Sequence, residues 1–150
     1  MNKVKPKQIA WLIPIVYLFH LADEYFTGFP GWFSGIFKVN LSLSDFIFIN
    51  SIGFTATIII AFLYTFNKVN NFIIASLGTL FFINGVIHIV SSLFTLSYSP
   101  GTISGLLLYL PLGYLIFKIF FPLLPEQQRS LSVVVGILIQ FVVAITALSI

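Results

Sequence analysis

The 150-residue sequence has no cysteine and little charge. Without cysteine, the chain can form no disulfide, thiolate metal site, iron–sulfur cluster or cysteine nucleophile. Charged residues make up 7% of the chain, whereas soluble globular domains contain about 25%. The net charge of +3 is too small, and too scattered along the edges of apolar runs, for a nucleic-acid-binding surface. These shortages exclude a soluble domain and a nucleic-acid-binding protein.

Apolar residues are in excess, at 59% of the chain and a mean hydropathy of +1.08. A helix needs about 20 mostly apolar residues to cross a bilayer. The stretches that meet this requirement are Ile9–Phe26, Phe46–Phe66, Phe72–Phe94, Thr102–Phe121 and Leu131–Ile150. Their connections are short, and the chain has no internal repeat. The sequence therefore predicts an all-α integral membrane protein, with five transmembrane helices in one compact bundle that forms a single transmembrane domain.

A short apolar segment between the first two stretches is predicted to be an interfacial helix over about residues 29–39. Pro30 suits its first turn. Its bulky side chains recur with helical spacing on one face: Phe29, Trp32, Phe33, Ile36 and Phe37. We expect this helix on the outer side of the membrane, either as a spacer against lipid or as a lid and lipid-entry ramp over a site. In the second case Trp32 is a candidate substrate-binding residue.

The basic residues predict how the chain is oriented in the membrane. Placing the N-terminus in the cytoplasm leaves Lys38 outside and puts the other basic residues inside: Lys3, Lys5, Lys7, Lys68, Lys118 and Arg129. The positive-inside rule favours this split, which places the C-terminus outside the cell membrane. The basic start also resembles a signal peptide, but the polar residues in the first stretch and the lack of a small-residue cleavage site favour a retained helix.

Ionisable groups inside membrane helices are costly, so they are the best pointers to function. Helical spacing places His20, Asp23 and Glu24 on one face of the first span, and Asn84 and His88 on one face of the third. At 1.5 Å per residue, each histidine lies about 9 Å below the outer end of its span.

By the same arithmetic Asn50, in the second span, lies about 6 Å below its outer end. We therefore predict that these histidines, carboxylates and carboxamides converge in the outer third of the bundle.

The loop over residues 95–101 is expected to close over this level. Ser99 and Pro100 form a good N-cap and first-turn pair for the fourth span, whose free N–H groups would then face the same cavity. Tyr98 and Gly101 become candidate substrate-binding residues. The simpler interpretation is a capped helix with Tyr98 in the aromatic belt of the membrane.

Three segments together resemble a known family. His20-Leu-Ala-Asp-Glu24, Asn84-x-x-x-His88 and Tyr98-Ser-Pro-Gly101 occur in that order. The set resembles the HXXEE-motif membrane proteins, a family whose function is not established. Asp23 stands where the family name has its first glutamate, so among the carboxylates Glu24 is the closest match.

Two imidazoles and a carboxylate commonly hold zinc or another divalent metal with one position open. His20, Glu24 and His88 are the candidate ligands. Asp23 or Glu24 can act as general base, or orient a histidine from behind, while Asn84 and Tyr98 are further candidate catalytic residues and Asn50 can bind substrate. A metal lowers the pKa of bound water toward about 7, which predicts a hydrolase for a lipid-like substrate.

Other interpretations of the same residues remain. The groups can form an interhelical hydrogen-bond network in a non-enzymatic membrane subunit, transfer protons or ions, or bind a small ligand. Haem held by both histidines is disfavoured because the neighbouring carboxylates crowd an apolar macrocycle. Gln140 in the last span is expected to form an interhelical hydrogen bond. Membrane lipids are the expected partners, and the oligomeric state stays open.

Overall fold

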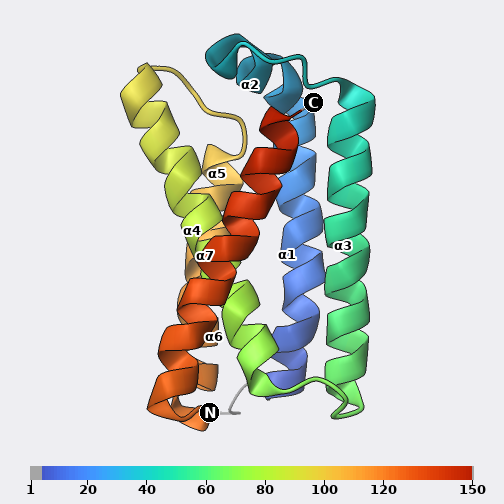
Figure 1. The fold of residues 1–150 in the computed structure, drawn as a ribbon, viewed down its shortest axis with the longest axis vertical. Helices are drawn as coiled ribbons and strands as arrows, with labels where there is room; N and C mark the ends of the chain where they lie inside the picture. Colours follow the sequence, from blue (N-terminus) through green and yellow to red (C-terminus); the bar gives the residue numbers. More distant parts are fainter. Residues whose placement is uncertain (1–4, 150) are drawn as a thin grey trace.

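The computed structural model describes residues 5–149, and these form helices and no strand. In chain order the helices are α1 (Pro6–Phe26), α2 (Phe29–Phe37), α3 (Leu43–Thr65), α4 (Asn71–Thr95), α5 (Thr102–Ser104), a π-helical turn η1 (Gly105–Tyr109), α6 (Leu110–Phe120), a 3₁₀ turn η2 (Phe121–Leu123) and α7 (Glu126–Leu148). Figure 1 shows the long helices running side by side, with α2 across one end.

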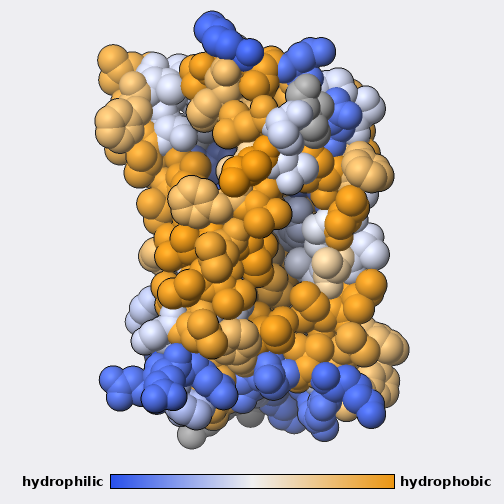
Figure 2. All heavy atoms as spheres, in the orientation of Figure 1, coloured by the Kyte–Doolittle hydropathy of each residue, from blue (hydrophilic) through white to orange (hydrophobic). Residues whose placement is uncertain are grey.

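Five helical segments are long and apolar enough to cross a membrane: α1, α3, α4, the segment from Thr102 to Leu123, and α7. This confirms the predicted all-α class. The helices extend past the apolar stretches, because α1 starts at Pro6 and α7 at Glu126. Apolar residues cover the middle of the molecule, and hydrophilic residues gather at its ends (Figure 2). Lys3, one of the basic residues predicted to be cytoplasmic, and Ile150, the predicted end of the last span, lie outside the described residues.

Helix α2 is set off from its neighbours by left-handed backbone at both ends. Gly28 has φ 80° and Lys38 has φ 58°, so the chain turns sharply after α1 and again before α3. The one buried side chain of α2 is Phe33, and Phe29 packs against Phe46 of α3 with ring centroids 5.8 Å apart. The apolar face of α2 therefore covers the end of the bundle.

The start of the fourth span differs from the prediction. The helix begins at Thr102 with Gly101 as its N-cap at φ 92°, and no side chain caps it. The predicted capping by Ser99 is wrong, because the hydroxyl of Ser99 lies 3.4 Å from Nδ1 of His88 and its N–H donates to the Ser92 hydroxyl. The loop is thus tied to α4 through side chains.

The hydrophobic core occupies the half of the bundle that contains the starts of α1 and α4 and the end of α6. Its members are Ile9, Ala10, Ile13, Ala61, Tyr64, Ile74, Ala75, Leu77, Phe81, Tyr109, Leu112, Ile116, Phe120 and Leu124. Helix α4 packs against α6 and α7, and α3 packs against α1. In the other half α4 leans away from α1 (Figure 1).

Candidate metal site and adjoining cavity

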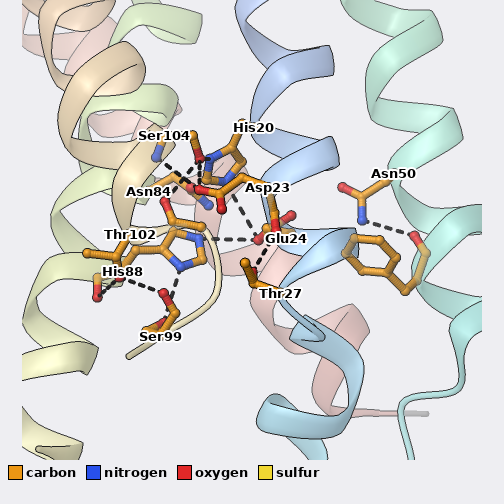
Figure 3. A network of polar contacts seen from close by, with 12 residues as sticks. His20, Asp23, Glu24, Thr27, Asn50, Asn84, His88, Ser99, Thr102 and Ser104 are labelled. Carbon is orange, nitrogen blue, oxygen red and sulfur yellow. Dashed lines mark hydrogen bonds and ion pairs between the residues drawn. The ribbon is translucent and has the colours of Figure 1, made fainter. Parts of the chain in front are cut away.

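His20, Glu24 and His88 converge inside the bundle, as their spacing and depth predict (Figure 3). The Glu24 Oε1 atom lies 3.6 Å from Nε2 of His20 and 3.3 Å from Nε2 of His88. The three residues are 2%, 6% and 4% exposed. Each offers one ligand atom, and these atoms all lie within 4.8 Å of one another. We call this group the His–Glu–His cluster.

The local sequence explains how the cluster forms. His20 and Glu24 are one helical turn apart on α1, and His88 comes from α4. Gly101 passes close to both imidazoles: a Cβ there would lie 2.8 Å from Cε1 of His88 and 3.0 Å from Cε1 of His20. Its positive φ also favours glycine. The Tyr98–Gly101 loop therefore seals the back of the cluster.

Asp23 lies behind His20 and reaches it through Ser104. The Asp23 carboxylate accepts hydrogen bonds from the Ser104 backbone N–H at 2.9 Å and from the Ser104 hydroxyl at 2.6 Å. The same hydroxyl lies 2.7 Å from Nδ1 of His20. The hydroxyl has one hydrogen, so when it donates to the carboxylate, the contact with His20 is a hydrogen bond in the tautomer in which Nδ1 carries the proton and donates to Ser104.

This hydrogen bonding determines what His20 presents to the cluster. In a neutral imidazole protonated at Nδ1, the Nε2 atom is a bare acceptor. Nε2 of His20 is buried without a hydrogen-bond partner and faces the Glu24 carboxylate, which is also an acceptor. Two buried acceptors that face each other need a cation between them, either a metal ion or a proton.

Tyr98, in the loop before α5, binds the Asp23 carboxylate. Its hydroxyl donates to Asp23 at 3.2 Å. Partial burial and the negative charge of Asp23 raise the pKa of Tyr98, so the hydroxyl stays protonated and remains a donor. Neither residue lines the cavity described below, so both act on the cluster from behind.

Two contacts at the cluster were not foreseen from the sequence. Tyr109, in the π-helical turn, stacks on His20 with ring centroids 4.0 Å apart. Gly85 and Gly105 allow this turn to approach α4, since a Cβ on Gly85 would lie 3.0 Å from the carbonyl oxygen of Gly105. Ser104 was missed as well, because its partner Asp23 is 81 residues away and no local motif links them.

A cavity of about 410 Å³ adjoins the cluster, whose three side chains form part of its wall. Side chains of α1, α3, α4 and α7 form its other walls, and α2 covers it. The lining is mostly apolar. Of the predicted substrate-binding residues, Trp32 and Asn50 line the cavity, as does Asn84, while Tyr98 and Gly101 do not. In Figure 2 the apolar surface is recessed below α2.

The carboxamides do not join the cluster directly. Asn50 accepts a hydrogen bond from the Tyr17 hydroxyl at 3.0 Å. Asn84 donates through Nδ2 to Oε1 of Gln140 at 3.4 Å, which confirms the interhelical bond predicted for Gln140. The Asn84 Oδ1 atom and the indole Nε1 of Trp32 are buried without a partner. The cavity thus has polar atoms on several walls besides the cluster.

The comparisons with known proteins agree with the resemblance found in the sequence. The model of the family described as "Protein of unknown function with HXXEE motif" matches residues 11–116, which include the cluster, Asp23 and Ser104. No curated protein and no solved structure matches the chain. The matched region covers more than half of the sequence and carries the whole His–Glu–His cluster, so the chain belongs to the HXXEE family.

Proposed function

We propose that the protein is a membrane-embedded metalloenzyme in which the His–Glu–His cluster binds a divalent metal ion, with zinc as the best match. The observation that carries this proposal is that Nε2 of His20 is buried without a hydrogen-bond partner and faces the Glu24 carboxylate at 3.6 Å. A metal ion removes the conflict between these acceptors and uses Nε2 of His88 as a third ligand.

The distances from Glu24 to the two imidazoles suit zinc, and all the ligand atoms lie within 4.8 Å of one another. Ligands about 2.1 Å from a tetrahedral ion lie roughly 3.4 Å from one another. The two distances from Glu24 Oε1 to the imidazole Nε2 atoms are 3.6 and 3.3 Å. Two histidines and one carboxylate also form a ligand set of zinc hydrolases, which leave the fourth position for water or substrate. All three ligands line the cavity, so the open position would face it.

The proposed reaction is hydrolysis of an ester or amide in a hydrophobic substrate. When bound, the metal supplies a water of lowered pKa and polarises the substrate carbonyl. Hydrolysis adds the water oxygen to the carbonyl carbon, breaks the bond to the leaving group and transfers a proton to that group. Because the cavity is mostly apolar and lies within a bundle of membrane helices, a lipid-like substrate fits it best.

The remaining residues take distinct parts in this proposal. Asp23 lies away from the cavity and holds Ser104, so we assign it the positioning of His20 rather than the role of general base. Tyr98 fixes Asp23 in turn. Glu24 and Asn84 are the polar side chains left beside a bound substrate, and Asn50 can contact it from the facing wall.

The metal proposal is tested by comparing His88→Ala with Gln140→Ala, because both remove a polar side chain from a span. Loss of an interhelical hydrogen bond in a membrane costs about 0.6 to 2 kcal/mol, so both variants should remain folded. Metal per folded protein, measured by elemental analysis alongside thermal stability in detergent, should fall to background in His88→Ala and stay near wild type in Gln140→Ala. Equal metal content in both would leave His88 as a structural residue and favour the non-enzymatic network.

The site is further proposed to face the outside of the cell. With the basic residues inside, α2 and the cluster lie near the outer surface. A topology reporter fused after Ile150 should then be active outside, and one inserted near Asn70 should be active in the cytoplasm. The reverse pattern would move the site to the cytoplasmic side without affecting the metal proposal.

A further inference from the structure

The last turns of α7 border the cavity but are not packed into the bundle. The last buried residue of this helix is Gln140. Beyond it, four more side chains of α7 line the cavity: Val143, Ala144, Ala147 and Leu148. Two of these, Val143 and Leu148, are 40% and 41% exposed. Residues 141–148, which we call the C-terminal segment of α7, therefore form a wall of the cavity without any buried residue to hold them in place.

The seam between this segment and α3 is thinly closed. Helix α7 packs along α4, and α3 packs along α1, whereas α3 and α7 make little contact with each other. On the α3 side the cavity lining includes the small residues Gly53, Ala56 and Thr57, of which Ala56 is exposed. Figure 2 shows the surface set back between α7 and α3. Both helices are long and apolar enough to cross a membrane, so lipid chains would lie against this seam.

The charge of the cavity lining limits the head group of such a lipid. Among the described residues that line the cavity there is no lysine or arginine, and the one carboxylate belongs to Glu24 in the cluster. Phosphate and sulfate groups are normally held by arginine or lysine in proteins. The lining therefore favours a lipid with an uncharged head group.

We infer that the ligand is an uncharged, single-chain lipid that enters the cavity sideways from the membrane, between α3 and the C-terminal segment of α7. Its head group lies at the cluster, and its chain lies along apolar side chains of these helices, such as Ile60 and Val143. The cavity volume of about 410 Å³ lies in the lower part of the range that holds small ligands, which agrees with one chain. As a substrate assignment this rests on the proposed function, but binding of the lipid does not require the metal.

Trp32 provides a signal for a bound chain. It lines the cavity from α2, and the ring centroid of Phe29 lies 6.1 Å from that of Trp32 and 5.9 Å from that of His88. The other tryptophan of the protein, Trp11, is hydrogen-bonded to Thr65 at the far end of α3, so Trp11→Phe leaves Trp32 as the reporter. Bromine quenches tryptophan fluorescence at short range. An acyl chain brominated next to its carbonyl therefore reports its arrival near the cluster.

The probe is a monoacylglycerol with this brominated chain, added at low mole fraction to phosphatidylcholine vesicles that contain the full-length protein after chelation. Quenching should saturate as the mole fraction rises, whereas random collisions in the bilayer increase in proportion to it. A lysophosphatidic acid with the same chain should need at least about tenfold more probe, because its charge finds no cation in the lining. Equal quenching by the two probes, or quenching that never saturates, would overturn the inference.

The route is tested with the same substitution at two neighbouring positions of α7. Val143 lines the cavity, whereas Val142 does not line it and is 63% exposed. Val143→Phe narrows the seam, so quenching after addition of the monoacylglycerol should be at least about fivefold slower. Val142→Phe should leave the rate unchanged. Thermal unfolding checks that both variants are folded. Equal quenching rates in the two variants would mean that the lipid takes another route.

Metal analysis of the same protein before chelation separates this inference from the proposed function. Protein that shows saturable, selective quenching but holds no metal would overturn the metalloenzyme proposal and leave the lipid and its route standing. Protein that holds metal in the cluster but shows no saturable quenching would overturn the lipid assignment alone.

Discussion

The half of the bundle around the start of α4 and the half around its end differ in how their helices meet. In the first half α4 is buried almost continuously from Ile74 to Thr79. In the second half its buried residues are Gly85 and His88, and Val90 is exposed. Helices are closely packed where α4 begins and lean apart where it ends (Figure 1).

Glycines explain the close packing of the first half, which we call the packed half. A Cβ on Gly136 of α7 would lie 2.5 Å from the carbonyl oxygen of Ser76, and a Cβ on Gly78 would lie 2.5 Å from Ile116. Small residues let helix backbones approach in membranes, where no hydrophobic force drives helices together. The packed half therefore gains its stability from dispersion contacts over many atoms.

The other half, which we call the open half, contains the features that cost stability. It has the buried His–Glu–His cluster, the unpaired Trp32 and Asn84 atoms and the cavity. Proteins tolerate such costs at functional sites when the rest of the fold compensates for them. A rigid base of packed helices can therefore support a site in which some polar groups have no partner within the chain.

Gly136→Leu in the packed half is expected to lower the stability of the fold more than any other substitution proposed below. The new side chain would collide with the Ser76 carbonyl and Thr79, and overpacking of this kind costs about 1 to 3 kcal/mol. Thermal unfolding in detergent should shift strongly downward, while metal affinity of the folded fraction stays unchanged because the cluster lies in the other half.

Gly31→Leu is the matched control for this change. A Cβ on Gly31, in α2, has nothing within 4 Å, so the same substitution there should leave the unfolding temperature near wild type. If both leucine variants unfold alike, the close approach at Gly136 does not account for the stability of the packed half.

The distinction between the halves was only partly predictable from sequence. The five spans followed from apolar length, and the approach of His20, Glu24 and His88 followed from helical spacing and matched depth. Span length and helical spacing are properties of one helix at a time, and the matched depth follows because every span crosses a membrane of the same thickness. Such local rules are enough to place residues at the same level of a bundle.

What could not be predicted depends on how different helices rotate and tilt against one another. The contact of Asp23 with Ser104 joins residues 81 positions apart, and the stacking of Tyr109 on His20 needs the π-helical turn of the fourth span. Gly101 as N-cap was missed because the hydroxyl of Ser99 turns toward His88 instead of toward the helix. The cavity is lined by side chains from α1, α2, α3, α4 and α7 together, so it cannot be predicted from any one segment of the sequence.

Ser104→Ala is expected to weaken metal binding. It tests the difference between the halves with a serine-to-alanine change that can also be made in the packed half. Removing the hydroxyl breaks the link from Asp23 to His20, and loss of a hydrogen-bond partner behind a metal ligand weakens metal binding about 10- to 100-fold. Without this partner, the Nδ1 proton of His20 is no longer fixed.

Ser76→Ala provides the control from the packed half. Ser76 is as buried as the cluster, but its hydroxyl donates only to the Phe72 carbonyl of its own helix, so its loss should leave metal affinity unchanged. Metal dissociation constants and the nitrogen NMR shifts of His20 in metal-free protein measure the two effects, since the chain has only two histidines. Wild-type Ser104 should show the Nδ1-protonated form, and Ser104→Ala a mixture of tautomers. If the two serine variants bind metal equally well and His20 keeps one tautomer in both, Ser104 does not position this ligand. The orientation of the His20 ring would then depend on its stacking against Tyr109.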